Sequence, residues 1–145
     1  MTEKSSERDV ECTCLKLRMA SRALSQIYDE ALRPVGIKTT QFSLLRMIQR
    51  LGPVTFQRLA EKMVLDQTTL PRSLRTLEKD GFIRIEAGED RRERLASVTA
   101  KGAAIIEKAL PRWRKAQDLV REKFPGEHLD ALMSELDRMR RAVAQ

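Results

Sequence analysis

A densely charged heptapeptide lies between two short segments of alternating polarity and limits the folds open to this chain. GEDRRER, from Gly88 to Arg94, contains six charged residues, and residues 82–86 and 95–99 beside it alternate apolar and polar side chains. Such alternation is typical of half-buried β-strands, so the sequence predicts a hairpin with the heptapeptide as its loop. Because this loop is longer than a two-residue turn, its tip should project from the body of the protein.

Two short predicted helices precede this hairpin. The first begins near Thr55, and the second carries leucines at helical spacing from Leu70 to Leu77 and ends at Gly81, a residue type that readily stops helices. Two helices joined by a short turn, the second polar and basic, are typical of a helix-turn-helix. The positions around the second helix that we predict to contact DNA are Gln67, Thr68, Thr69, Arg72 and Arg75.

Pro71 leaves two starts open for this second helix. If Asp66 is the cap, the proline removes an internal hydrogen bond, whereas with Thr68 as the cap it lies harmlessly in the first turn. We favour the later start, which leaves the individual roles of Gln67 and Thr68 open.

Amphipathic helices flank this central unit. Apolar residues recur every four positions over residues 15–31, beside a second apolar row, so this first helix must be covered on two sides. Pro34 and Gly36 should end it, and Thr39 or Thr40 should cap a shorter helix that extends to residue 51.

The last third of the chain is predicted as two further helices, residues 103–124 and 129–143, separated by a Pro-Gly turn. Their apolar residues alternate spacings of three and four, which is typical of a seam between helices, and Pro111 should bend the longer one. We therefore predict a mainly α fold with a small β-hairpin, in which residues 1–145 form a single domain. It comprises a winged helix-turn-helix lobe (38–101) and a helical dimerisation region formed by the N- and C-terminal helices (10–34 and 102–145).

Positive charge concentrates in the central lobe. The chain has a formal net charge of +7, and residues 38–101 carry 13 Lys or Arg against 8 Asp or Glu, a net charge of +5, whereas the flanks contribute +2. This concentration favours a polyanionic partner over a merely solvated surface. No apolar run approaches the roughly 20 residues of a membrane span, and the N-terminus lacks the apolar core of a signal peptide, so we expect a cytoplasmic protein with no membrane partner.

The stretch from Val54 to Gly102 resembles the winged helix-turn-helix of the multiple-antibiotic-resistance regulator (MarR) family. The most specific motifs are Asp90-Arg91-Arg92 in the loop and Thr99-Ala100-Lys101-Gly102 at the next helix start, and the helix order agrees over residues 10–143. The resemblance implies a homodimeric bacterial transcription regulator. We expect it to bind a palindromic DNA operator and to repress transcription there. It also implies that the terminal helices form the dimer interface and that each wing enters a minor groove. Pro71 departs from the family pattern, where a polar residue is more usual.

The wing arginines are Arg91, Arg92 and Arg94. A minor groove has a concentrated negative potential that attracts arginine. Asp90 would pair with one guanidinium and fix the loop, as the matching aspartate does in the family, so that another arginine points outward. A charged hairpin loop alone is most often a solvated turn, and the preceding helix pair is what favours DNA binding.

Release from DNA has two predicted routes. The resemblance implies a small aromatic or anionic effector in a crevice between the dimer helices and the lobe, near Tyr28, Phe42 and Arg46. The two cysteines, Cys12 and Cys14, are either plain side chains at the dimer interface or a thiol switch or soft-metal sensor. Residues two apart point to nearly opposite sides of a helix, so an interchain disulfide is easier than one within the chain.

Catalytic and metal chemistry have little support in the sequence. The single histidine, His128, follows a Pro-Gly turn and is expected at the surface, and no Gly-rich phosphate loop or paired-carboxylate motif is present. Two cysteines and one distant histidine do not supply four zinc ligands. We expect no enzymatic activity, cofactor or metal. The alternative to a regulator is a winged-helix module that coats DNA without sequence preference or binds protein.

Overall fold

The structure is a computed structural model that describes residues 11–144. Residues 1–10 and 145 lie outside this range. Two expectations concern these residues and therefore also lie outside the described part of the chain: that the N-terminus has no signal peptide, and that the dimerisation region begins at Val10. No helix in the described range is long and apolar enough to cross a membrane.

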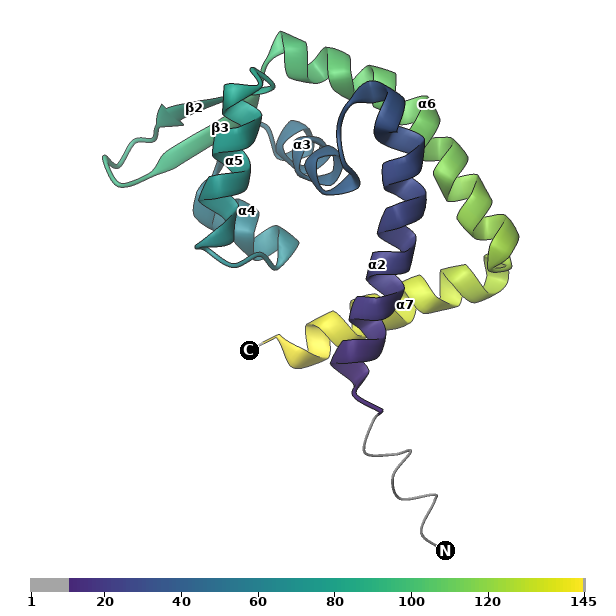
Figure 1. The fold of residues 1–145 in the computed structure, drawn as a ribbon. Helices are drawn as coiled ribbons and strands as arrows, with labels where there is room; N and C mark the ends of the chain where they lie inside the picture. The colour runs from purple at the N-terminus through teal and green to yellow at the C-terminus, as the bar shows by residue number, and fades with distance from the viewer. Residues whose placement is uncertain (1–10, 145) are drawn as a thin grey trace, which may run out of the picture.

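Helices make up most of the described chain (Figure 1). They are α2 (Thr13–Leu32), the 3₁₀ helix η1 (Arg33–Val35), α3 (Thr39–Leu51), α4 (Phe56–Met63), α5 (Thr69–Lys79), α6 (Ala100–Lys123) and α7 (Gly126–Val143). The strands β1 (Val54–Thr55), β2 (Ile83–Ala87) and β3 (Arg94–Val98) form one antiparallel sheet in the order β1-β3-β2. Helices α3, α4 and α5 with this sheet form a lobe beside α2, α6 and α7, which confirms the predicted fold class.

A single hydrophobic cluster holds the lobe together. Ile48 of α3, Leu59 of α4 and Leu74 of α5 are fully buried in it, and Leu32 at the end of α2 and Ile106 of α6 join them. Burying one such side chain contributes about 1.5–3 kcal/mol. The first half of α6 therefore packs as part of the lobe, and the rest of this helix leads away from it.

The beginning of α3 differs from the prediction. Its N-cap is Lys38, so neither Thr39 nor Thr40 is the capping residue. The carboxylate of Asp29, on α2, instead accepts a hydrogen bond of 2.7 Å from the main-chain nitrogen of Thr39. This bond satisfies one of the free amides at the helix start from a different element, which local sequence rules do not reveal.

Strand β1 was not predicted. Val54 pairs with Ala96 and Thr55 with Leu95, so β3 becomes the central strand of the sheet. Two residues are too short to show alternation, and they form a strand because β3 offers them a free edge. Helix α4 begins next to Thr55, as predicted, and Thr55 caps it, since its hydroxyl oxygen accepts a hydrogen bond from the Arg58 amide.

The two C-terminal helices form as predicted. Helix α6 continues through Pro111, and its ribbon curves between the sheet and α7 (Figure 1), as a proline within a helix allows. Helix α7 follows the Pro125 turn and has no buried residue in the single chain. Leu129 and Leu136 are half-buried, whereas Leu132, Met133 and Met139 are exposed, so the apolar face of α7 is only partly covered within the described chain.

Candidate nucleic-acid interface

Helix α5, which we call the recognition helix, begins at the later of its two possible starts. Thr69 is its first residue and Thr68 its N-cap, so Pro71 lies in the first turn, where the main-chain nitrogen needs no partner within the helix. The prediction of the later start is confirmed.

Asp66 stabilises the turn before this helix. One carboxylate oxygen accepts a hydrogen bond from the Thr68 amide at 3.1 Å and the other accepts from the Thr68 hydroxyl at 2.9 Å. These two bonds, the main-chain bond foremost, lower the pKa of Asp66 because they stabilise its charged form. Gln67 and Thr68 therefore belong to an ordered turn at the entrance to the helix, and both are exposed.

The recognition helix has a buried face and an opposite basic face. Leu70, Leu74 and Leu77 are at most 1% exposed and pack into the core. By helical geometry Arg72 and Arg75, both exposed, point the other way. Exposed Lys79 lies four residues beyond Arg75 and extends this face; the i, i+4 spacing was the signal that could have included it in the predicted site.

The wing is a regular hairpin with a six-residue tip. Strand β2 pairs with β3 from Ile83 opposite Val98 to Ala87 opposite Arg94, so Arg94 belongs to the strand and not, as predicted, to the loop. The main-chain nitrogen of Gly88 donates to the Glu93 oxygen at 2.9 Å, which closes the loop one residue earlier than predicted.

Asp90 fixes the tip in a different way from the one expected. Its carboxylate accepts a 3.2 Å hydrogen bond from the main-chain nitrogen of Arg92, as in an Asx turn. The ion pairs of the described chain include none to Asp90, so the expected guanidinium pair is not formed. The carboxylate holds the backbone, and the side chains of Arg91 and Arg92 stay exposed at the tip.

A cleft of about 240 Å³ connects the wing to the helix pair. Gln67 and Pro71 line it from the recognition helix side, and Arg92 and Arg94 line it from the wing. Gln57 of α4 lines it too and was not predicted, because nothing in the local sequence places α4 beside the wing. Of the predicted DNA-contacting residues, the structure thus brings Gln67 together with Arg92 and Arg94 in one cleft.

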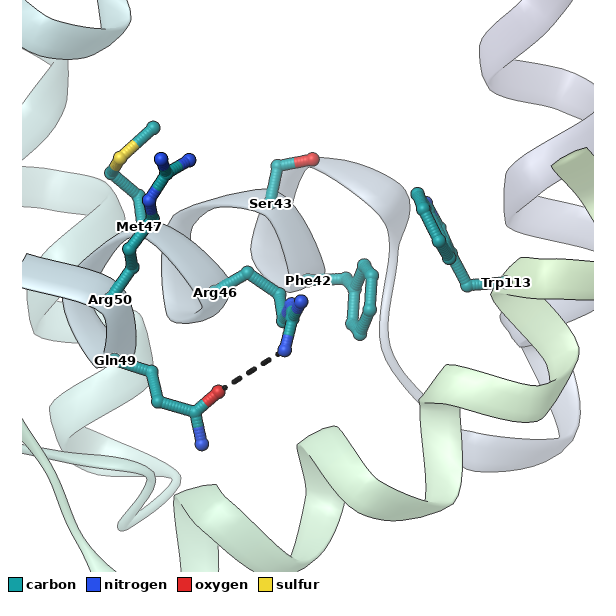
Figure 2. Close-up of a pocket in the computed structure, with 7 residues that line it drawn as sticks. All are labelled: Phe42, Ser43, Arg46, Met47, Gln49, Arg50 and Trp113. Atoms are coloured by element: carbon teal, nitrogen blue, oxygen red, sulfur yellow. Dashed lines mark hydrogen bonds between the residues drawn. The ribbon is translucent and has the colours of Figure 1, made fainter.

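A second concave site lies between α3 and α6 (Figure 2). Phe42, Arg46, Arg50 and Trp113 line a cavity of about 450 Å³, and the ring centroids of Phe42 and Trp113 are 6.0 Å apart. The Arg46 guanidinium donates to the side-chain oxygen of Gln49 at 3.4 Å. Phe42 and Arg46, both predicted near an effector, therefore line one cavity together with Trp113. Arg50 was detectable from its i, i+4 spacing to Arg46, whereas Trp113 comes from a distant helix.

Tyr28, predicted for the same crevice, lies in a different one. It lines a cavity of about 930 Å³ between α2, α7 and the lobe, which Thr69 of the recognition helix also lines. The Tyr28 hydroxyl donates a hydrogen bond to the side-chain oxygen of Gln117 on α6. Burial raises the pKa of this tyrosine, and the positive charge of Arg121 partly opposes that effect.

Both cysteines lie at the beginning of α2 and are exposed in the single chain. Cys12 is the N-cap and has extended backbone, and Cys14 lies in the first turn. His128 is exposed on α7 and packs beside Phe124, with ring centroids 6.0 Å apart, so its predicted surface position is confirmed.

Comparisons with known proteins agree with this arrangement. Residues 37–93 match the model of the MarR family. The chain is 38% identical to the Mycobacterium tuberculosis transcriptional regulator MosR, solved in complex with DNA, with a TM-score of 0.81 over 93% of this chain and 100% of MosR. It is 32% identical to the organic hydroperoxide resistance transcriptional regulator of Bacillus subtilis over 98 residues, 67% of each chain. It is also 26% identical to the B. subtilis HTH-type transcriptional regulator YwoH over 124 residues, which is 86% of this chain and 90% of YwoH.

These relatives are transcriptional regulators, a class without enzymatic activity, and MosR shares the fold described above. This chain therefore belongs to the MarR family of DNA-binding transcription regulators.

Proposed function

We propose that this protein is a cytoplasmic, sequence-specific repressor that binds a palindromic DNA operator as a homodimer. The observation that carries the proposal is the joint exposure of Arg72 and Arg75 on the recognition helix and of Arg91 and Arg92 at the wing tip, on one lobe. Such a lobe is suited to place the helix in a major groove and the wing in an adjacent minor groove. The likeness to MosR, solved in complex with DNA, supports this mode of binding.

The exposed apolar residues of α2 and α7 favour association with a second copy. Helix α7 is 18 residues long without a buried residue, and its Leu132 and Met133 are 41% and 56% exposed. Helix α2 exposes Leu15 and Met19 in the same way. Amphipathic helices are stabilised mainly by burial of their apolar faces, and a two-fold partner presenting the same two helices would cover both.

Selection of DNA from a fragmented genomic pool tests the proposal. The recovered sequence is compared with random DNA of equal length at one salt concentration. A regulator should prefer a two-fold symmetric sequence by at least about 10³-fold, and a promoter carrying that sequence should be repressed when the protein is present. Equal affinity for both DNAs would support a DNA-coating module, and no recovered DNA would support a protein-binding module.

For release from DNA, we propose that an aromatic carboxylate binds the cavity between α3 and α6. The half-buried Trp113 ring offers a stacking surface beside the buried Phe42 ring, and the guanidinium groups of Arg46 and Arg50 offer charge for the carboxylate. Tyr28 lines the other cavity and would contact a ligand only if one bound there.

Trp113 reports on this site directly because it is the single tryptophan of the chain. Titration with a series of benzoates should quench its fluorescence, and the same ligands should release operator DNA. Arg46→Ala should raise the ligand concentration that is needed for both effects. Fluorescence that does not respond to any benzoate would exclude this cavity as the site for that class.

A second route is oxidation of Cys12 and Cys14. Both are exposed, and Cys12 has extended backbone just before the helix. The relationship to an organic hydroperoxide resistance regulator supports this route. Non-reducing electrophoresis after mild peroxide treatment, alongside operator binding by wild type and a Cys12→Ser/Cys14→Ser variant, tests it. Identical responses of the two proteins to peroxide would leave the ligand route as the means of release.

A further inference from the structure

Residues at the start of α6 form hydrogen bonds to the carbonyl groups that follow the recognition helix. The ammonium of Lys101 donates to the Asp80 carbonyl at 2.8 Å, and the Thr99 hydroxyl donates to the Gly81 carbonyl at 2.6 Å. The Thr99 main-chain nitrogen donates to the Phe82 carbonyl at 3.0 Å. The three consecutive carbonyls that follow α5 are therefore satisfied by Thr99 and Lys101.

Gly102 holds the same two segments in close contact. A Cβ at this position would lie 2.0 Å from the Phe82 carbonyl oxygen and 2.9 Å from a Val98 methyl group, so no side chain fits. The Gly102 nitrogen donates to the Thr99 hydroxyl oxygen at 3.0 Å, which also caps α6. The Lys101 ammonium lies 5.4 Å from the centre of the Phe82 ring, within the range of a cation–π contact.

Helix α6 connects this contact region to the uncovered part of the molecule. It packs into the core through Ile106 and Ala109, and its second half buries Ala116 and Val120 before α7 begins. Figure 1 shows α6 running from the sheet past α2 to α7. The orientation of the recognition helix relative to α2 and α7 therefore depends on how α6 is held against the lobe, by the contacts of its first turn as well as by the core packing of Ile106 and Ala109.

We infer that Thr99, Lys101 and Gly102 are positioning residues for DNA recognition: they set the angle between the recognition helix and α6, and thereby align the two recognition helices of a dimer. The inference rests on the proposed function, because it requires a dimer that reads DNA through α5. The contacts lie at the far end of an 11-residue helix, about 16 Å from Thr69 at the end that enters the groove. Half-sites on DNA are about 34 Å apart, so a small rotation at this joint misaligns both helices.

Thr99→Val tests the inference without changing the net charge. Valine has nearly the shape of threonine but cannot make the bonds to Gly81 and Gly102. We expect affinity for the selected operator to fall about tenfold or more, while affinity for random DNA, which depends on charge, stays within about twofold. Thr99→Ser keeps the hydroxyl and should restore operator affinity. A role in folding alone would lower stability without changing the ratio of the two affinities.

Lys101→Met provides an independent test because the residue is exposed and its aliphatic stem is kept. Lys108→Met, on the exposed side of the same helix, removes the same charge and serves as the control. The ratio of operator to random-DNA affinity should fall for Lys101→Met alone, and the salt dependence of random-DNA binding should be the same for both variants.

The inference is overturned if the ratio of operator to random-DNA affinity is unchanged in Lys101→Met, or if it is unchanged in folded Thr99→Val. If Thr99→Val fails to fold, Lys101→Met decides. A wild-type protein without operator preference would instead refute the proposed function, so the two failures are distinguishable.

Discussion

At the scale of single residues, Val64 is the one non-glycine residue with positive φ among the residues that the structure describes. Its φ of 54° places a β-branched side chain in the left-handed region, which costs about 1–2 kcal/mol. The residue is 68% exposed, so its packing offsets little of that cost. The strain lies in the turn that leads into the recognition helix.

We predict that Val64→Asn raises the free energy of unfolding by about 1 kcal/mol, because asparagine tolerates left-handed backbone. Val64→Ile keeps the branched carbon and should give no gain. Denaturant unfolding of both variants measures the difference, and equal stability of the two would show that the left-handed backbone is not strained.

A second prediction at this scale concerns the titration of Asp66. Its pKa should lie below that of an ordinary aspartate, because the Thr68 amide and hydroxyl donate to the carboxylate. A lowered folded-state pKa means that its stabilising contribution is present above the unfolded-state pKa and is lost as the pH falls through the folded-state value. NMR titration of the side-chain carboxyl should show this, and Thr68→Ala should raise the midpoint while leaving the main-chain bond. A midpoint that is ordinary in wild type and unmoved in the variant would contradict the assignment.

Among the elements, the wing should contribute to operator affinity independently of the recognition helix. Arg91→Ala/Arg92→Ala should weaken operator binding and flatten the dependence of log affinity on log salt by about one to two units, because up to two phosphate-linked charges are lost. Arg112→Ala/Lys115→Ala, which removes the same charge from the exposed side of α6, is the control. If the two double variants bind with the same affinity and salt slope, the wing has no special role.

Most elements could be predicted because their signals are local. The apolar periodicity of α2, α6 and α7 marks helices without reference to the rest of the chain, and Gly81, with φ of 79°, ends the recognition helix as expected. The features that were missed depend on distant partners. Strand β1 exists because β3 lies beside it, and α3 begins with a hydrogen bond to Asp29 of another helix.

The same distinction holds for the candidate sites. The exposure of Arg72, Arg75 and the wing arginines follows from helix and strand geometry, so the sequence alone could place them at the surface. The effector residues could not be grouped correctly, because Trp113 approaches Phe42 only through packing of α6 on α3, and Tyr28 faces a separate cavity.

At the scale of the whole molecule, the uncovered faces of α2 and α7 predict an obligate dimer. Replacing two central apolar residues of α7, Leu132→Glu/Leu136→Glu, puts charge on the face that lines the large cavity and should disrupt association. Equilibrium sedimentation at micromolar concentration should give twice the chain mass for wild type and a lower mass or unfolding for the variant. A folded wild-type monomer at that concentration would contradict the proposed assembly.

In the proposed complex, the two recognition helices of one dimer read two major-groove half-sites on the same face of the DNA. Measuring the affinity for the selected operator before and after insertion of about 5 base pairs at its centre tests this most directly, because half a helical turn moves one half-site to the opposite face. The insertion should lower affinity to nearly that for random DNA, while changing a base outside both half-sites should have little effect. Equal affinity for the original and the inserted operator would contradict the claim.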